Sequence, residues 1–149
     1  ASKDHANYLE NRSSISHIQD IDKKATPHLR AEYYGRSYQR TRENIARIFI
    51  HRKTQALFGQ TTRISTYKKA ARTLAEGWMN SPGHYRNIIK ESYNITGIAV
   101  NYNRRNNAVT AVQTFGTTSA DYTYNITKNQ YFPYQDQEIK QETKKAKGT

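Results

Sequence analysis

Apolar residues recur at the three- and four-residue spacing of a helix over much of the first two thirds of the chain. The pattern is clearest at residues 67–78, where one apolar stripe ends on Trp78. Residues 1–11 and 42–50 follow the same spacing over shorter lengths. We therefore expect a helix in each of these segments, the longest of them at residues 67–78.

Two further helices are indicated by the residues that begin them, a hydroxyl side chain followed by proline. The Thr-Pro pair at residues 26–27 is typical of a helix start, and Gly35 is a typical end. The Ser-Pro pair at residues 81–82 signals another start, and residues 84–91 continue it as a short helix. These signals depend on local backbone chemistry and not on burial.

The apolar period then changes from helical to two. Residues 95–102 alternate in this way, and the turn at residues 103–107 leads into a second strand at residues 108–115, which predicts an antiparallel hairpin. Residues 121–126 favour a further strand or extended segment, and residues 135–149 a charged tail. Helices followed by an antiparallel sheet predict an α+β fold.

A chain of 149 residues is long enough for one domain with a core, which we place at residues 1–134, ahead of the tail at 135–149. There is no cysteine, so neither disulfides nor thiolate metal sites are available. No apolar run reaches the length of a membrane span, so we expect no transmembrane segment. We expect the domain to be monomeric.

The net charge of +12 is concentrated in residues 23–72, which hold thirteen Lys or Arg against Glu32 and Glu43. Such a field attracts polyanions, among them sulfated glycans, anionic lipid surfaces and nucleic acid. No motif of a nucleic-acid-binding module accompanies the charge, so specific nucleic-acid recognition is not expected. A solvated basic surface without a dedicated partner is the alternative interpretation.

Two segments carry the most specific signal in the chain. Residues 43–46 read Glu-Asn-Ile-Ala, and residues 77–89 read Gly-Trp-Met-Asn-Ser-Pro-Gly-His-Tyr-Arg-Asn-Ile-Ile. Their order and spacing resemble the CAP superfamily (cysteine-rich secretory protein, antigen 5, pathogenesis-related 1; also called SCP-like domains), in its cysteine-free bacterial form. The resemblance covers roughly residues 1–116. It implies a three-layer α-β-α sandwich with a central, mainly antiparallel sheet.

The opening of the chain resembles the second helix of such a domain, and the family's usual first helix, with its Asn-x-x-Arg motif, is absent from it. We expect that helix and a targeting segment to precede residue 1. The family implies a secreted or cell-surface protein. Abundant Lys, Asn, Ile and Tyr without cysteine suit a spirochaetal surface lipoprotein, anchored at the bacterial outer surface through a lipidated cysteine in the preceding segment.

The resemblance also implies a cleft built from two His and two Glu, of which this chain matches three. His17 matches the first His, Glu43 the Glu of the Glu-Asn-Ile motif, and His84 the second His. The place of the second Glu, counted from the signature Trp78, is taken by Ser81. We expect all four positions to line a ligand-binding cleft, but the lost carboxylate argues against an activity that needs the complete set.

The matched residues suggest two kinds of site. The imidazoles of His17 and His84 are ligands that suit Zn²⁺, so a weakly bound divalent metal is one reading, although no cofactor is certain. Glu43 can then orient an imidazole or act as a general base. The same three side chains equally suit a closed hydrogen-bonded cluster that ties the helical layers together.

The family context favours an extracytoplasmic binding protein without enzymatic turnover. Its expected ligand is lipidic or anionic (a lipid, a sterol, a sulfated glycan or a host protein), held by the central cleft or by the basic surface of residues 23–72. The alternative is a metal-assisted hydrolase, a peptidase, with His17, Glu43 and His84 as its catalytic candidates. A protein–protein interaction module displayed on the cell surface is a third reading.

Overall fold

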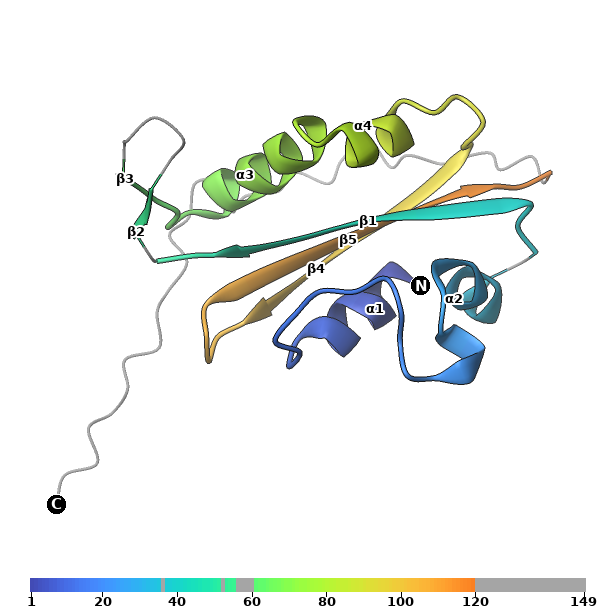
Figure 1. Cartoon of the computed structure of the whole chain (residues 1–149), viewed down its shortest axis with the longest axis horizontal. Helices are drawn as coiled ribbons and strands as arrows, with labels where there is room; N and C mark the ends of the chain where they lie inside the picture. Colours follow the sequence, from blue (N-terminus) through green and yellow to red (C-terminus); the bar gives the residue numbers. More distant parts are fainter. Residues whose placement is uncertain (36, 52, 56–60, 120–149) are drawn as a thin grey trace, which may run out of the picture.

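The computed structural model describes residues 1–35, 37–51, 53–55 and 61–119, which form three layers (Figure 1). A central sheet lies between two helical layers. The upper layer contains α3 (Tyr67–Met79) and α4 (Pro82–Ile88), and the lower layer contains α1 (Ser2–Leu9), the 3-10 turn η1 (Asp22–Lys24) and α2 (Pro27–Tyr34). The prediction of a three-layer α+β fold with an antiparallel central sheet is confirmed.

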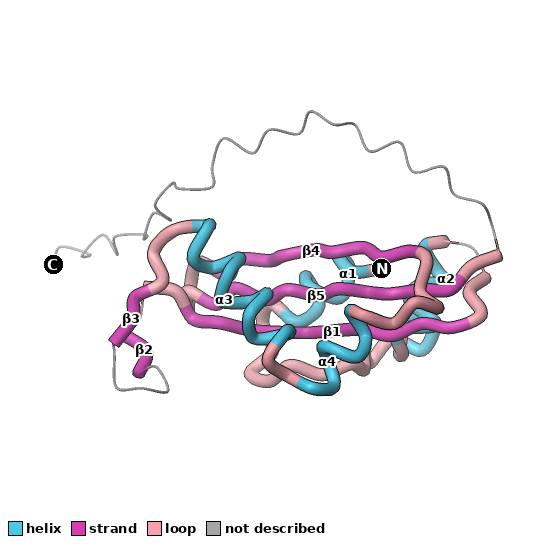
Figure 2. Tube along the Cα trace, turned by 90° about the horizontal axis from the view of Figure 1, so that it is seen from above, coloured by secondary structure: helices cyan, strands magenta, loops and turns pink. Residues whose placement is uncertain are grey.

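The central sheet consists of three antiparallel strands in the order β1-β5-β4 (Figure 2). They are β1 (Arg40–Phe49), β4 (Ile95–Asn103) and β5 (Ala108–Thr117). The strands β4 and β5 form the predicted hairpin, and β1 pairs with the other side of β5, with Glu43 opposite Thr114. Two short strands, β2 (Lys53–Gln55) and β3 (Thr61–Arg63), pair separately. Within the central sheet, β1 is therefore an edge strand.

The helix α3 buries its predicted apolar stripe against the upper face of the sheet. The Thr66 hydroxyl caps the helix by accepting a hydrogen bond from the Lys69 N–H at 3.2 Å. Leu74 and Trp78 are 5% and 7% exposed. They belong to the larger core cluster, which comprises Ile50, Ile64, Ala70, Leu74, Trp78, Val109 and Ala111. The stripe predicted at residues 67–78 is confirmed as the face that meets the core.

The lower layer begins and ends its helices close to the predicted positions. The Thr26 hydroxyl accepts from the Leu29 N–H at 3.2 Å, and Gly35 follows the last turn of α2. In α1, the buried Ala6 and Leu9 face the sheet. They form the smaller core cluster together with Ile45 and Val112. Each helical layer thus has an apolar core of its own on one face of the sheet.

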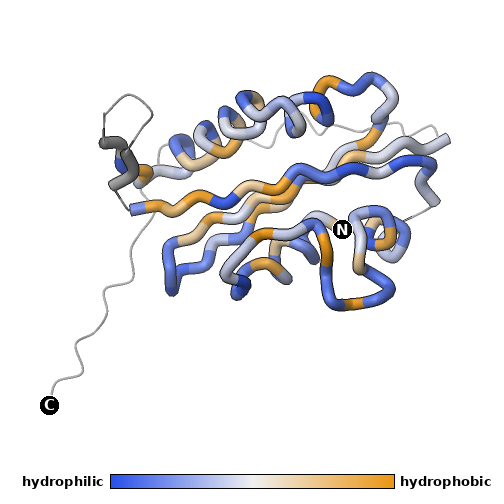
Figure 3. Tube along the Cα trace, viewed as in Figure 1, coloured by the Kyte–Doolittle hydropathy of each residue, from blue (hydrophilic) through white to orange (hydrophobic). Residues whose placement is uncertain are grey.

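The expectation of a helix over residues 42–50 is wrong, because residues 42–49 lie in β1 and Ile50 follows the strand. Ile45 packs into the lower core cluster, whereas Ala46 and Ile48 pack against the upper one. A strand covered by helices on both faces carries apolar residues at successive positions, which in a short window imitates helical spacing. Figure 3 shows that β1 is hydrophilic in its first half and mainly hydrophobic, with one hydrophilic position, in its second. The hydrophilic half lies where α2 and α4 both contact the strand.

Two predictions fall on residues that the structure does not describe. The strand at residues 121–126 and the tail at residues 135–149 lie outside the described ranges, so the domain boundary at residue 134 stays a prediction. Within the described ranges, no helix is both long enough and apolar enough to cross a bilayer.

Candidate functional site

Glu43 is the buried centre of the hydrophilic half of β1, and its side chain is 1% exposed. The Nη2 of Arg30 donates to both carboxylate oxygens, at 2.9 Å to Oε1 and 3.0 Å to Oε2. Arg30 is itself 0% exposed, so the ion pair is held away from water. An unpaired carboxylate at this depth would be costly, and the guanidinium compensates for its burial.

Arg30 also binds the backbone of two other segments. Its Nη1 donates to the carbonyls of Lys24 and Ala25 at 3.0 and 3.2 Å, and its Nη2 donates to the carbonyl of His17 at 2.9 Å. The side chain therefore joins α2, η1 and the loop that carries His17 to the strand. The sequence patterns do not single out Arg30. The available signal was the inward-facing position of Glu43, because a buried carboxylate requires a cation nearby.

His17 reaches Glu43 from the loop between α1 and η1. Its Nδ1 lies 3.0 Å from Glu43 Oε1, and the imidazole is the donor because an ionised carboxylate only accepts. The side chain is 52% exposed. The bond to Glu43 thus fixes the orientation of a half-exposed ring, and in the neutral ring it leaves Nε2 as the nitrogen that can accept from a ligand.

His5 is a second imidazole beside Glu43, for which the sequence indicates no partner. Its Nε2 lies 2.8 Å from the Ser16 carbonyl oxygen and 3.6 Å from Glu43 Oε1, and its Nδ1 lies 2.9 Å from the amide nitrogen of Gln19. The amide of Gln19 donates to Nδ1 and Nε2 donates to Ser16, which is the pattern of a neutral ring. Burial lowers the pKa of His5 more than the Glu43 charge raises it. Its place one helical turn before Leu9 was the signal that it faces inward.

His84 lies on the opposite wall of the site, in the first turn of α4. The amide of Asn44 donates to the His84 carbonyl at 3.1 Å and accepts from the Asn87 amide at 2.8 Å. Because side chains alternate along a strand, Glu43 faces the lower layer and Asn44 faces the upper one. Burial, and then the charge of His17, lower the pKa of His84. Two adjacent residues of β1 therefore position the two walls of the site: Glu43 holds the wall with His17, and Asn44 holds the wall with His84.

We expect Asn44→Ala to lower the free energy of unfolding by about 1–3 kcal/mol, because it leaves the His84 carbonyl and the Asn87 amide without their partner. Asn44 is 0% exposed, so water does not replace it without rearrangement. Urea unfolding measures the change, and the imidazole resonances of His84 report whether the wall moves. The exposed Asn7→Ala serves as the control, with a change within about 0.5 kcal/mol. Unshifted His84 resonances in Asn44→Ala would contradict this positioning role.

Ser81 occupies the N-cap position of α4. Its carbonyl accepts from the Tyr85 N–H at 2.8 Å, but its side chain makes no capping bond. It is absent from the described residues that line the cavity beside His84. Its assignment to the ligand cleft stays a prediction.

The three matched residues His17, Glu43 and His84 line one cavity at the edge of the sheet, between α2 and α4, with a volume of about 480 Å³. A second hollow of about 670 Å³ adjoins it. The two share His28, Thr41, Arg42, Gly83 and Asn87. We call the combined depression the edge groove. Its other lining residues are Thr26 and Pro27 in the first hollow and Gln39, Arg40, Arg86, Lys90 and Tyr93 in the second.

The donor atoms of the edge groove fit a metal ion poorly. Among the described residues, no three His, Cys, Asp or Glu side chains are grouped so that they could hold one. Glu43, the only carboxylate among the described residues that line the groove, already accepts bonds from Arg30 and His17. Metal binding by His17 and His84 therefore stays a prediction, and the described residues offer these two imidazoles no third ligand.

Comparison with known proteins identifies the class of protein. The model of the CAP family, the cysteine-rich secretory protein family, matches residues 1–115, and the chain belongs to this family. Among solved structures, an outer surface protein from Borrelia burgdorferi superposes with a TM-score of 0.53 at 21% sequence identity, over 78% of this chain and 72% of that one. At that identity the likeness shows the fold. No curated protein matches the sequence.

Proposed function

We propose that this CAP domain is an extracytoplasmic binding protein whose edge groove holds an anionic ligand, a sulfated glycan, without chemical turnover. The observation that carries the proposal is the charge of the groove. Arg40, Arg42, Arg86 and Lys90 line it, and the only carboxylate among its described lining residues is neutralised from inside the protein by Arg30. The groove therefore offers cations to a ligand and no free anion.

The cations of the groove are available to a ligand. All four lie on exposed residues, and no carboxylate of the described residues pairs with any of them. Glu32 lies beside the groove but pairs with another lining residue, because its Oε1 lies 3.3 Å from Nε2 of His28. A groove that gathers one sign of charge focuses the field and raises the local concentration of oppositely charged ligands.

The lining supports a polar anionic ligand over a lipid. No Leu, Ile, Val, Met or Phe is among the described residues that line the two hollows, and the second hollow, which holds Arg86 and Lys90, is the more polar of the two. Sites that hold an acyl chain or a sterol are lined predominantly by apolar side chains. Guanidinium groups, in contrast, are planar forks of N–H donors that can bind two oxygens of an anionic group at once.

The proposed surface location is supported by the family and by the solved structure that resembles this chain. That protein is named an outer surface protein of Borrelia burgdorferi. A sulfated glycan of a host surface is the kind of ligand that a protein at that location meets.

The alternative, a metal-assisted hydrolase, requires Glu43 to act as a base or as a ligand. Both of its oxygens accept bonds from a buried guanidinium, and one also accepts from His17. A carboxylate with these partners is poorly placed to take a proton from water or to bind an ion. This bonding supports binding without turnover.

We expect the double variant Arg42→Gln/Arg86→Gln to bind heparin about tenfold more weakly than the native protein, because two exposed ion pairs contribute about 1–2 kcal/mol together. Calorimetric titration with heparin and with desulfated heparin, each at two salt concentrations, measures the effect. Native binding should weaken as salt rises and should require the sulfates.

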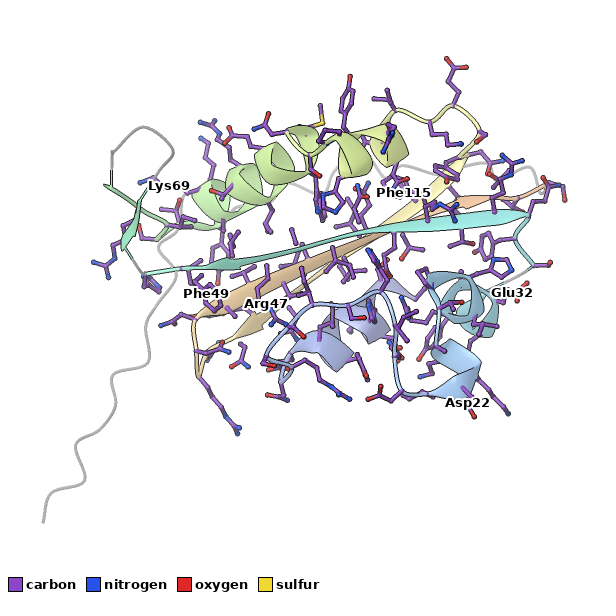
Figure 4. The ribbon with its side chains drawn as sticks, viewed as in Figure 1. Asp22, Glu32, Arg47, Phe49, Lys69 and Phe115 are labelled. Carbon is purple, nitrogen blue, oxygen red and sulfur yellow. The ribbon has the colours of Figure 1, made fainter. Side chains whose placement is uncertain are left out.

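The matched control removes two charges elsewhere, in Lys69→Gln/Arg72→Gln on α3. Lys69 lies at the opposite end of the molecule from Glu32, which marks the end that holds the edge groove (Figure 4). The control should bind heparin within twofold of the native protein. Equal losses of heparin affinity in both double variants would show that only the net charge of the protein matters. Heparin binding that does not weaken as salt rises would exclude the proposal.

A further inference from the structure

A buried arginine is the least expected component of this site, because it lies behind the groove and not on its surface. Arg30 is 0% exposed, yet its Nη2 contacts both oxygens of the carboxylate that lines the groove. It therefore acts on the groove from inside, through Glu43. Such a residue cannot contact the ligand directly. It can, however, determine whether a cation or an anion binds beside Glu43, because it compensates the charge of that carboxylate.

We propose that Arg30 is the residue that determines the sign of charge that the edge groove accepts. It serves as a permanent internal cation for Glu43, occupying the carboxylate that a divalent metal would need. The groove is thereby left to the exposed arginines and to anions. This inference rests on the proposed function for the anionic nature of the ligand. It adds that Arg30 is the residue that excludes a metal ion from the groove.

The geometry around the carboxylate supports this exclusion. Oε1 of Glu43 accepts from Arg30 at 2.9 Å and from His17 at 3.0 Å, and Oε2 accepts from Arg30 at 3.0 Å. A metal ion at either oxygen would lie beside a fixed guanidinium charge and would be repelled by it. His5 is a third polar neighbour, with its Nε2 3.6 Å from Oε1, and it further encloses the carboxylate.

Arg30 is also held so that it cannot withdraw. Its Nη1 is bound by the carbonyls of Lys24 and Ala25, and its Nη2 by the carbonyl of His17. Its Nε has no hydrogen-bond partner among the described residues. The guanidinium is therefore held through its two terminal nitrogens alone. An incoming metal would have to break these bonds and leave a buried cation without its carboxylate.

Zinc titration calorimetry at neutral pH tests the inference on four proteins: the native chain, Glu43→Gln, Arg30→Met and the double variant Arg30→Met/Glu43→Gln. We expect Glu43→Gln to change the Zn²⁺ affinity of the native protein by less than twofold, because Glu43 is not a ligand while Arg30 is present. Arg30→Met should bind Zn²⁺ at least tenfold more tightly than the native protein. The double variant should return to the native affinity.

The design separates the possible outcomes. A tenfold loss of zinc affinity in Glu43→Gln would overturn the inference, and so would a folded Arg30→Met that binds like the native protein. If circular dichroism shows that either single variant is unfolded, the comparison of the native protein with the uncharged double variant decides, and weaker zinc binding by the double variant overturns the inference. Failure of the native protein to bind heparin would instead remove the proposed function and leave the zinc result standing.

Discussion

Arg30→Met is expected to lower the free energy of unfolding by about 3–5 kcal/mol, the largest effect of any single substitution in the site. The substitution keeps the unbranched stem and removes the guanidinium, which leaves Glu43 as an uncompensated charge with a 1% exposed side chain. It also removes the bonds to the carbonyls of Lys24, Ala25 and His17. Urea unfolding followed by circular dichroism measures the change.

The cause is isolated by removing the second charge. Arg30→Met/Glu43→Gln leaves no buried ion, and we expect it to regain at least half of the lost stability, because replacing both partners of a buried pair costs much less than breaking it. Arg86→Met makes the same chemical change on the exposed face of α4 and should stay within about 0.5 kcal/mol of the native protein. A double variant no more stable than Arg30→Met would show that the backbone bonds, and not the ion pair, carry the effect.

Trp78→Ala is expected to lower the free energy of unfolding by about 3–5 kcal/mol. Trp78 is 7% exposed and packs in the upper core cluster with Ile50, Leu74 and Val109. Removing the indole leaves a cavity between α3 and the sheet that the neighbouring side chains fill only in part. Thermal and urea unfolding measure the loss.

Two further variants make the test specific. Trp78→Phe retains a ring and removes an indole N–H that has no partner among the described residues, so we expect it to lose less than half as much. Met79→Ala, at the neighbouring position, which is 50% exposed, should change stability by less than about 0.5 kcal/mol. A small loss in Trp78→Ala would mean that the signature Trp is not a core anchor.

The elements that the sequence predicts well are those with local causes. The helix start at Thr26 and the stripe that ends on Trp78 depend on the backbone and on helical spacing, and each has a counterpart in the structure. The alternation in residues 95–102 and the turn at residues 103–107 likewise indicate the hairpin without knowledge of the rest of the chain. The helix prediction for residues 42–50 is wrong for the opposite reason. β1 is covered by helices on both faces, so its pattern of apolar residues depends on the tertiary structure.

The site divides in the same way. The residue types and order at His17, Glu43 and His84 could be matched to a family from the sequence, and the structure brings all three to one cavity. Arg30 could not be identified, because it lies thirteen positions from Glu43 in a short helix whose sequence does not mark it as buried. Its burial, and therefore its role as the partner of Glu43, is visible only once α2 is packed against β1.

The sequence by itself determined the family, the α+β class and the concentration of basic residues in the first half of the chain, because each depends on residue type and short-range spacing. The tertiary structure decided how Glu43 is used. Burial makes a carboxylate costly unless a cation accompanies it, and only the packing of α2 against β1 shows that Arg30 is that cation. The same packing leaves the exposed arginines as the charges that a ligand meets in the edge groove.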